Sequence, residues 1–347
     1  MPRERSAGRH GRGAGVAGRA RLPGDRSGAR PRVRPCSWEQ GVSSAQDIAI
    51  PGLRERAPIP TWFNIGGGAD RTARPRTEQE LRVCLSVDPE LVVLGGGANL
   101  LVDDDGTDRL VVVLDSGVFV EKEIDEASGR VVAGAGCDFP KLLIESVRAG
   151  LGGLEGLGGI PGTVGGLVRM NAGGKFGSIA DAVVRVNALD RNGDRVVLER
   201  AEIPFGYRKS GLEEFVIVSA EFALVPCEPA QARDRLKEVM RYKSQSQPMG
   251  ADSAGCCFKN PTLAADIYDI GRAGETVPAG LLIDRAGCKG QAVGGATVSD
   301  RHANFIVTSP GATASDVIAL MDRVAEAVRE RFGVELEREV VVWSRRA

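Results

Sequence analysis

The sequence predicts a soluble protein of mixed helices and strands that is divided into two domains. A chain of 347 residues is long enough for two domains with a sizeable core. Its hydrophobic content of 42% and charged content of 26% are those of an ordinary soluble globular protein. Segments with strand and helix spacing follow one another along the chain, and the prolines at Pro226 and Pro229 mark the expected domain boundary.

Composition also narrows the class of function. No window approaches about 18 uninterrupted apolar residues and no apolar signal core opens the chain, so we expect no membrane span and a cytoplasmic location. Seven cysteines without a C-x-x-C pair argue against a disulfide framework or a zinc site. His10 and His302, the two histidines, are too few for an HExxH site and leave little room for a Ser-His-Asp triad. We therefore expect no metal, and proton chemistry that rests on other side chains.

Residues 1–45 differ in composition from the rest of the chain. The first 40 contain ten arginines and three acidic residues with hardly any large apolar side chain, so we expect a disordered Arg/Gly-rich tail. Because this block carries +7 and the whole chain −1, the remainder is near −8, which gives no indication of nucleic-acid binding. The tail could bind RNA or a membrane surface weakly, but a solvated or mis-translated leader is the favoured interpretation.

The first ordered segments lead to a glycine run. Residues 61–70 have the pattern of a short strand and turn, residues 77–87 that of a helix capped by Thr77, and residues 91–94 that of a buried strand. The run GGGANLL at 95–101 follows that strand directly. Its unblocked backbone N–H groups can converge on phosphate oxygens, so it predicts an anion-binding turn.

A second glycine-rich stretch covers residues 151–177. Eleven of its 27 residues are Gly, yet Leu, Ile, Val and Met lie between them, so it belongs inside a folded domain. It predicts a cradle for a flat or phosphate-bearing cofactor, with a set of tight turns between buried strands as the alternative. Further strands are predicted at 110–114, 118–124, 130–136, 183–198 with a turn at 190–193, 215–224 and 336–343, and helices at 139–149, 230–243 and 314–332.

Eleven short motifs occur along residues 60–343. In order they are NIGGGAD, LGGGANLLV, GLEGLGGIPGTVGG, MNAG, FGYRKS, SAGCCFKNP, AGLLID, GCKG, VGGATVS, HANFIV and LEREV. Each is weak alone, but together the chain resembles the flavin-dependent UDP-N-acetylenolpyruvoylglucosamine reductases (UDP-N-acetylmuramate dehydrogenases) of bacterial cell-wall synthesis. The short run at 207–255 resembles the compact second type of that family.

The resemblance implies an α+β fold and two cofactors, FAD and NADPH. A two-lobed FAD-binding fold of the vanillyl-alcohol-oxidase (PCMH) type would occupy residues 57–226, with lobes at about 57–115 and 116–226. A smaller α+β substrate-binding domain would follow at 230–344. The residues implied in FAD binding are Gly95, Gly96, Gly97, Ala98, Asn99 and Leu100 around the pyrophosphate, and Ile160, Pro161, Gly162, Thr163, Val164, Gly165, Asn171 and Gly173 along the isoalloxazine.

The implied reaction is the reduction of UDP-N-acetylglucosamine enolpyruvate to UDP-N-acetylmuramate. NADPH reduces FAD, which gives hydride to the β-carbon of the enolpyruvyl group. The charge left behind needs electrostatic stabilisation, and the α-carbon needs a proton. By resemblance, Arg208 and Glu339 stabilise the enolate, because a guanidinium suits bidentate binding of the carboxylate. From the residues alone, a surface cation is the favoured interpretation of Arg208, and Glu339 would pass as a solvent-facing carboxylate.

Cys256 stands where many members of the family have the proton-donating Ser. A thiol, with an ordinary pKa of about 8.5, is a much stronger acid than a hydroxyl, so we predict that Cys256 is the proton donor. Its thiolate would be tolerated near Arg208 or Lys259, at the cost of sensitivity to oxidation. We expect Cys257 to be a small buried hydrophobic residue.

The implied substrate is a small molecule, a UDP-sugar enolpyruvyl ether. Substrate-binding positions carried over from the motifs are Tyr207, Lys259, Asn260, Lys289 and His302. Departures from the family pattern are Lys175 and Phe176 in place of a tyrosine motif, Ala98 in place of Ser, and Val341 in place of Arg. Two other readings stay open: an alcohol oxidase or dehydrogenase of the same flavin fold, and a non-enzymatic RNA-binding protein that acts through its tail.

Overall fold

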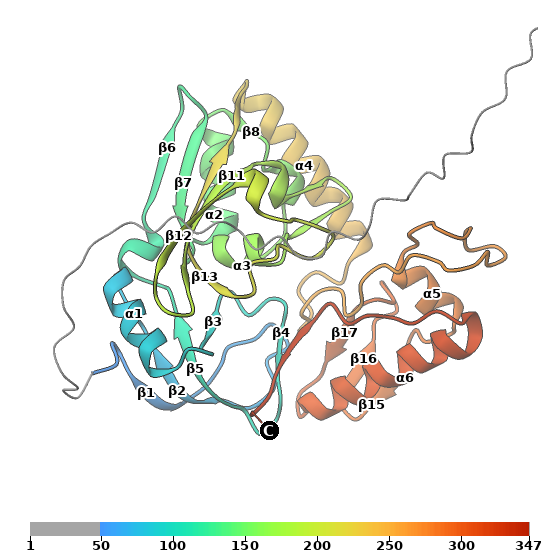
Figure 1. Ribbon diagram of the computed structural model, residues 1–347. Coiled ribbons are helices and arrows are strands. Elements are labelled where there is room, and N and C mark those ends of the chain that lie inside the picture. The colour runs from blue at the N-terminus through green and yellow to red at the C-terminus, as the bar shows by residue number, and fades with distance from the viewer. Residues whose placement is uncertain (1–48, 347) are drawn as a thin grey trace, which may run out of the picture. The chain divides into compact units, whose positions relative to one another are not determined.

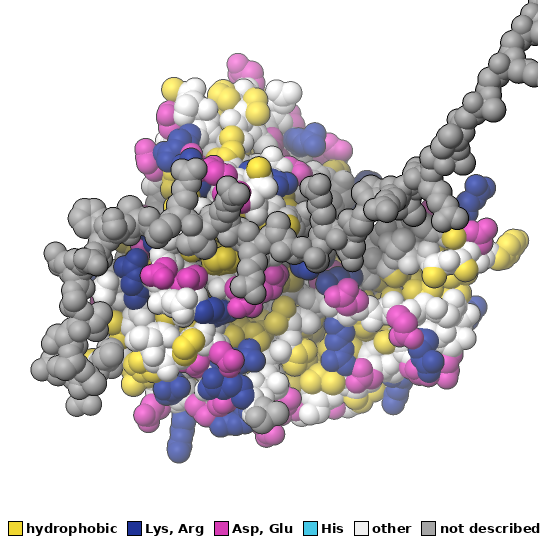
Figure 2. Space-filling view, viewed as in Figure 1, with side chains coloured by type: hydrophobic (Ala, Val, Ile, Leu, Met, Phe, Trp, Pro, Cys, Tyr) yellow, Lys and Arg dark blue, Asp and Glu magenta, His cyan; other side chains and the backbone are white. Residues whose placement is uncertain are grey.

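The computed structural model describes residues 49–346, whose helices and strands are labelled in Figure 1. The disorder and the RNA binding predicted for residues 1–45 lie outside this range. Buried apolar side chains form three clusters, of which the largest lies around the central antiparallel sheet and the second belongs to the C-terminal region. On the face shown in Figure 2, acidic and basic side chains of the described residues are interspersed.

The first sheet has four strands in the order β1-β2-β5-β3. β5 is parallel to both β2 and β3, and α1 provides the crossover between β2 and β3 that a parallel arrangement requires. The side chain of Thr77 accepts a hydrogen bond of 3.2 Å from the backbone of Glu80, which confirms the predicted helix start. The elements are β1 (Arg54–Ala57), β2 (Ala69–Ala73), α1 (Glu78–Val87), β3 (Val92–Leu94) and β5 (Thr107–Val113).

The second sheet has five antiparallel strands in the order β12-β11-β13-β7-β6. The helix α3 packs against β13 and β7 and carries the second glycine stretch to the sheet. The elements are β6 (Lys122–Asp125), β7 (Arg130–Gly134), α2 (Phe139–Arg148), β8 (Leu151–Gly152), η2 (Glu155–Leu157), α3 (Val164–Arg169), β9 (Gly173–Gly174), β10 (Gly177–Ser178), η3 (Ile179–Asp181), β11 (Val183–Asp190), β12 (Arg195–Glu199), η4 (Arg200–Glu202), β13 (Phe215–Ala223) and β14 (Val225–Pro226).

The C-terminal region packs α6 against the small sheet β15-β16-β17 and against α5 (Figure 1). α6 has the predicted bounds because Thr313 and Asp316 form a capping box and Gly333 ends the helix at φ +67°. The elements are α4 (Pro229–Ser246), α5 (Ala279–Arg285), β15 (Ala292–Val293), β16 (Ala296–Val298), β17 (Ile306–Thr308), α6 (Ala314–Phe332) and β18 (Val341–Trp343).

Two connections link this region to the preceding one. α4 contacts α2, β8 and η2, and its Ala232 belongs to the largest hydrophobic cluster. β18 pairs in parallel with β4 (Leu100–Val102), directly after the first glycine run. The domain boundary at 226–229 stays a prediction, and by its contacts α4 packs with elements that precede that boundary.

Three predicted strands are wrong in part. Residues 61–68 contain a turn at 62–63 and otherwise irregular backbone, Gly67 packs directly on the backbone of Gly106, and β2 begins only at Ala69. The segment 118–124 begins as the 3-10 helix η1 (Gly117–Val120), since Gly117 has φ +61° and the next amide donates to the carbonyl of Arg76. Of the predicted strand 336–343, only Val341–Trp343 is regular strand.

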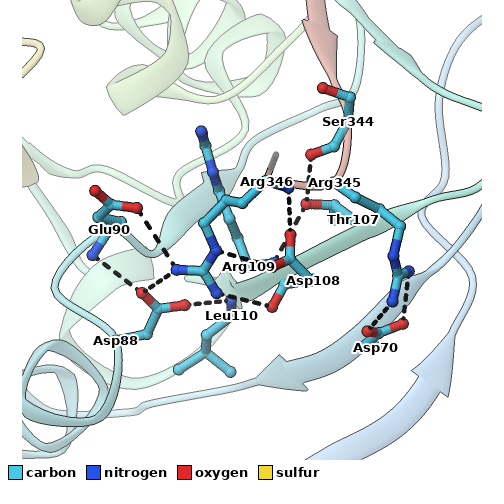
Figure 3. A network of polar contacts seen from close by, with 10 residues as sticks. All are labelled: Asp70, Asp88, Glu90, Thr107, Asp108, Arg109, Leu110, Ser344, Arg345 and Arg346. Carbon is cyan, nitrogen blue, oxygen red and sulfur yellow. Dashed lines mark hydrogen bonds and ion pairs between the residues drawn. The ribbon is translucent and has the colours of Figure 1, made fainter.

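The last residues attach the chain end to the first sheet (Figure 3). Arg345 pairs with Asp70 at 2.6 Å, and Arg346 pairs with Asp108 at 2.9 Å and with Asp88 at 3.4 Å. Asp88 also accepts the backbone N–H of Leu110 at 2.8 Å. Within residues 49–346 no helix is both long and apolar enough to cross a membrane.

Candidate active site

A cavity of about 1050 Å³ is lined by both glycine stretches and by segments of the C-terminal region. Its volume is at the upper end of the range of about 300–1,000 Å³ that ligand pockets usually have, which leaves room for a large cofactor together with a second ligand. The predicted catalytic residues Arg208, Cys256 and Glu339 all line it.

The two glycine stretches meet backbone to backbone in one wall of the cavity. A Cβ at Gly96 would lie 2.8 Å from the Cα of Gly162, and a Cβ at Gly95 would lie 2.9 Å from Oγ1 of Thr163. Gly162 has φ +134°, a conformation that side chains rarely permit. Apolar side chains such as Ile160 complete the wall. A cavity walled by bare backbone and apolar side chains fits a flat cofactor with phosphate groups, so the residues present fit FAD.

Most residues predicted for FAD line this cavity, but three of them have other contacts in the structure. Val164 is fully buried in the core, and it does not line the cavity. Asn171 does not line it either, because its amide donates to the carbonyl of Gly206 at 2.7 Å. Asn99 lines the cavity, but its amide donates to the carbonyl of Glu339 at 3.1 Å. The two asparagines thus hold the backbone of segments that carry the charged side chains of the site.

Arg208 is held in a strained position. It lies in a tight turn closed by hydrogen bonds between Gly206 and Lys209, with φ +54°, which is costly for a residue with a side chain. Its Nη1 donates to the carbonyl of Gly173 at 2.7 Å, and its Nε lies 2.5 Å from Oε1 of Glu339. This close pair is an ion pair rather than a well-directed hydrogen bond, since Nε has no partner of good geometry among the described residues. The two contacts fix the guanidinium within the cavity wall.

Asn304 organises the segment that carries Cys256. Its side chain accepts the N–H of Phe258 at 2.9 Å and donates to the carbonyl of Phe258 at 2.8 Å, while its carbonyl accepts the N–H of Cys257 at 2.8 Å. On the other side, the N–H of Glu339 donates to Cys257 at 2.7 Å. Because neighbouring side chains of an extended segment point to opposite faces, Cys256 faces the cavity and Cys257 faces the core. Cys257 is 1% exposed, which confirms the prediction of a small buried residue.

Burial in the cavity shifts the pKa values of Cys256 and Glu339 toward their neutral forms. Burial, followed by the charges of Glu339 and Cys257, raises the pKa of the Cys256 thiol to about 12, while Arg208 and Lys243 act in the opposite direction. Burial also raises the pKa of Glu339, against the effect of Arg208. Cys256 is therefore a neutral thiol at neutral pH. A neutral thiol reacts more slowly with oxidants than a thiolate, and the sensitivity of Cys256 to oxidation stays a prediction.

Three of the predicted substrate residues line the cavity: Asn260, Lys289 and His302. Oδ1 of Asn260 accepts the N–H of Ala279 at 2.9 Å, and Lys289 pairs with Asp284 at 2.8 Å. Nδ1 of His302 accepts the N–H of Asn304 at 3.3 Å, and burial lowers the pKa of this imidazole, so it is neutral at neutral pH.

Tyr207 and Lys259, the other two, do not belong to the cavity lining. Lys259 pairs with Glu337 at 2.5 Å, and Tyr207 is 53% exposed. The hydroxyl of Tyr207 accepts the N–H of Asn260 at 3.2 Å, and its ring lies 5.5 Å from the guanidinium of Arg208. Tyr207 therefore contacts cavity residues from outside the lining, whereas the partner of Lys259 lies outside the lining as well.

Lys243 is a cavity residue that the sequence did not single out. It lies on α4, is 9% exposed and lines the cavity. The buried residues of α4 are Ala232, Val239 and Lys243, and their spacing of seven and four places them on one helix face. The signal in the sequence that could have identified Lys243 is a charged residue on the buried face of a predicted helix. The same helix carries Tyr242, whose ring centroid lies 4.6 Å from Nζ of Lys175.

Comparison with known proteins defines first the class of protein. The family model "FAD binding domain" matches residues 69–199, and the protein is an enzyme, a flavin-dependent oxidoreductase. A second model, "UDP-N-acetylenolpyruvoylglucosamine reductase, C-terminal domain", matches residues 247–343. The chain belongs to the family of UDP-N-acetylenolpyruvoylglucosamine reductases, which confirms the resemblance seen in its motifs.

Individual relatives agree over most of the chain. The reductase of Moorella thermoacetica is 42% identical over 288 residues, which is 82% of this chain and 90% of that protein. The reductase of Syntrophobacter fumaroxidans is 42% identical over 292 residues, 82% of this chain and 81% of that protein. The crystal structure of the enzyme from Thermus caldophilus has a TM-score of 0.69 at 38% identity and covers 82% of this chain and 96% of its own. The predicted two-domain α+β fold is thereby confirmed.

Proposed function

We propose that the protein catalyses the NADPH-dependent, FAD-mediated reduction of UDP-N-acetylglucosamine enolpyruvate to UDP-N-acetylmuramate, in the synthesis of peptidoglycan precursors. The observation that carries the proposal is the arrangement of Arg208, Glu339 and Cys256 in one glycine-walled cavity. The reaction needs a fixed cation for a carboxylate and a proton donor for a carbon atom. When bound, FAD supplies the hydride that reaches the β-carbon of the enolpyruvyl group.

Arg208 binds the substrate carboxylate and stabilises the charge that develops there. Its Nε and Nη1 are held by Glu339 and by the carbonyl of Gly173, so the cation does not need to reorganise during the reaction. Glu339 acts through Arg208, because it fixes one edge of the guanidinium. Their side chains are only 18% and 11% exposed, and in such a shielded place a charge acts more strongly than in water.

Cys256 gives its proton to the α-carbon. The S–H bond breaks, a C–H bond forms, and the electron pair stays on sulfur. The raised pKa of the thiol ensures that the proton is present at neutral pH before each turnover. The same shift makes the thiolate costly to form, so the donor needs a cation nearby when it gives up the proton.

Three further cavity residues bind the nucleotide part of the substrate. Lys289 supplies positive charge for the diphosphate, and Asn260 and the neutral His302 supply hydrogen bonds. Tyr207 supports Asn260 through its hydroxyl, and Lys259 adds charge next to it in the chain.

An anaerobic flavin assay tests the proposal. The protein purified with FAD should be yellow, NADPH should bleach it, and UDP-N-acetylglucosamine enolpyruvate should restore the colour with formation of UDP-N-acetylmuramate, identified by mass spectrometry. NADH at the same concentration serves as the control for reductant preference. A protein that is not bleached by NADPH, or that is bleached but not recoloured by this substrate, would contradict the proposed reaction.

A further inference from the structure

Lys243 reaches the cavity across the second glycine stretch. Its Cδ lies 3.3 Å from the position that a Cβ at Gly159 would take, and Gly159 has φ +72°. The aliphatic part of the lysine therefore packs on bare backbone, and the residue as a whole is only 9% exposed. Since Lys243 lines the cavity, α4 delivers a buried cation to the catalytic site.

Arg208 and Cys256 line the same cavity as Lys243, and the charge of Arg208 lowers the pKa of Lys243 while that of Cys256 raises it. Arg208 is paired with Glu339, whereas Lys243 has no carboxylate within the 4.0 Å of an ion pair among residues 49–346. Glu155, on the element η2 that packs against α4, accepts the N–H of Gly153 instead. Lys243 is thus a buried cation without a carboxylate partner among residues 49–346, and it is positioned for an anion that forms only during the reaction.

We propose that Lys243 is a positioning residue for the proton transfer, and that its ammonium group stabilises the thiolate of Cys256 after the proton has left. This inference rests on the proposed function, in which Cys256 is the donor. The electron pair of the broken S–H bond stays on sulfur, in the cavity that Lys243 also lines. A proton from water then restores the thiol, and Lys243 keeps its own proton throughout.

The electrostatics of the site support this role. Burial, then the charge of Arg208, lowers the pKa of Lys243 to about 8, while Cys256 acts in the opposite direction. Below that pH the lysine is charged and can stabilise the thiolate. Above it the lysine is neutral, so its effect on Cys256 is lost as the pH rises. Lys259, which the sequence offered as the counter-charge, pairs instead with Glu337.

Alkylation of Cys256 by iodoacetamide tests the inference without substrate. The reagent reacts with the thiolate, so its rate reports the thiolate fraction, and mass spectrometry of the FAD-loaded protein locates the label. Lys243→Met should slow alkylation at pH 7 about tenfold, because the charge of Lys243 lowers the pKa of Cys256 and a shift of about one unit changes the thiolate fraction tenfold. At pH 10, where Lys243 is neutral, the rates of the variant and the native protein should converge. Lys243→Arg should retain most of the native rate at pH 7.

Lys237→Met is the matched control. Lys237 lies on the same helix, but its side chain is 65% exposed and pairs with Asp234 at 3.0 Å. This variant should alkylate at the native rate at both pH values. Equal rates for Lys243→Met and native protein at pH 7 would overturn the proposal, as would a slowing that is the same at pH 7 and pH 10, because that reports access rather than charge. Absence of labelling in every variant would contradict the cavity position of the thiol. These outcomes are separate from a failure of the flavin assay, which would instead contradict the proposed reaction.

Discussion

The molecule contains two clusters of charged side chains that are built from similar residues in opposite ways. The C-terminal cluster joins Arg345 and Arg346 to Asp70, Asp88, Glu90 and Asp108, and the cavity cluster contains Arg208, Lys243, Cys256 and Glu339. In the C-terminal cluster each arginine has a carboxylate, and Arg346 has three within 3.5 Å (Figure 3). The cavity cluster contains two cations but one carboxylate, Glu339, which pairs with Arg208 and not with Lys243.

The two clusters also differ in how far their side chains are exposed to solvent. The side chains of Arg345 and Asp70 are 45% and 47% exposed, against 18% and 11% for Arg208 and Glu339. At the surface, hydrogen bonds to Arg346 lower the pKa of Asp108 to about 2. In the cavity, burial dominates and drives the pKa values of Cys256 and Lys243 to about 12 and about 8. In the exposed cluster the arginines are paired with carboxylates and attach the chain end to the first sheet. The buried cluster has excess positive charge, which an anionic ligand can balance.

Cys256→Ala should have the largest effect, because it removes the proton donor of the cavity cluster. We expect reoxidation of the reduced flavin by the enolpyruvyl substrate to slow by a factor of about 10² to 10⁴, the usual contribution of a general acid. Stopped-flow absorbance measures this half-reaction apart from reduction by NADPH. Cys256→Ser is the matched control and should keep measurable activity, since a hydroxyl can still donate. If the Ala variant reoxidised at the native rate, Cys256 would not be the donor.

Glu339→Gln should have the next largest effect. The amide keeps the shape of the side chain but removes the charge that fixes Nε of Arg208 at 2.5 Å. We expect substrate-dependent reoxidation to slow about a hundredfold, like the loss of one oxyanion-stabilising group, and flavin reduction by NADPH to stay near the native rate. Glu337→Gln is the control, because Glu337 pairs with Lys259 outside the cavity lining. An equal change in both half-reactions of Glu339→Gln would argue against its role through Arg208.

Local sequence predicted those elements whose ends are set by nearby residues. The capping box of Thr313 and Asp316 and the terminal Gly333 gave α6 its observed bounds. The strands that were wrong depend on distant contacts instead. Gly117 turns the chain toward Arg76, and Gly67 packs on Gly106, and neither partner can be read from the local pattern.

The residues of the site also divide into those that local motifs identify and those that depend on distant contacts. The motifs pointed to Arg208, Cys256 and Glu339, which the structure brings into one cavity from three distant segments. Lys243 belongs to no motif, and it reaches the cavity only because α4 packs against η2 and the glycine wall. The left-handed conformation of Arg208 was equally inaccessible, because a turn between Gly206 and Lys209 imposes it.

Arg346→Ala should have a modest effect that is confined to the C-terminal cluster. The substitution removes pairs to Asp88, Glu90 and Asp108, all with an arginine that is 36% exposed. Exposed ion pairs stabilise little, so we expect the melting temperature to fall by about 2 °C in low salt. The difference should shrink in about 1 M NaCl, where screening acts within about 3 Å. Both flavin half-reactions should remain at native rates; a loss of activity would show that the two clusters are coupled.

Asp108→Asn should have the smallest effect on stability. The direction in which this effect changes with pH should be opposite to that for Glu339→Gln in the cavity cluster. The folded pKa of Asp108, about 2, lies below its ordinary value of about 3.9. Its contribution to stability is therefore present above pH 4 and is lost as the pH falls toward 2, so the melting temperatures of native protein and variant should converge in acid.

Glu339 has a raised pKa, and its carboxylate therefore disfavours folding most at neutral pH. The stability of the native protein relative to Glu339→Gln should then rise as the pH falls from 7 to about 4. If the stability difference between the native protein and the variant changed with pH in the same direction for Asp108→Asn and Glu339→Gln, desolvation would not distinguish the cavity cluster from the C-terminal one.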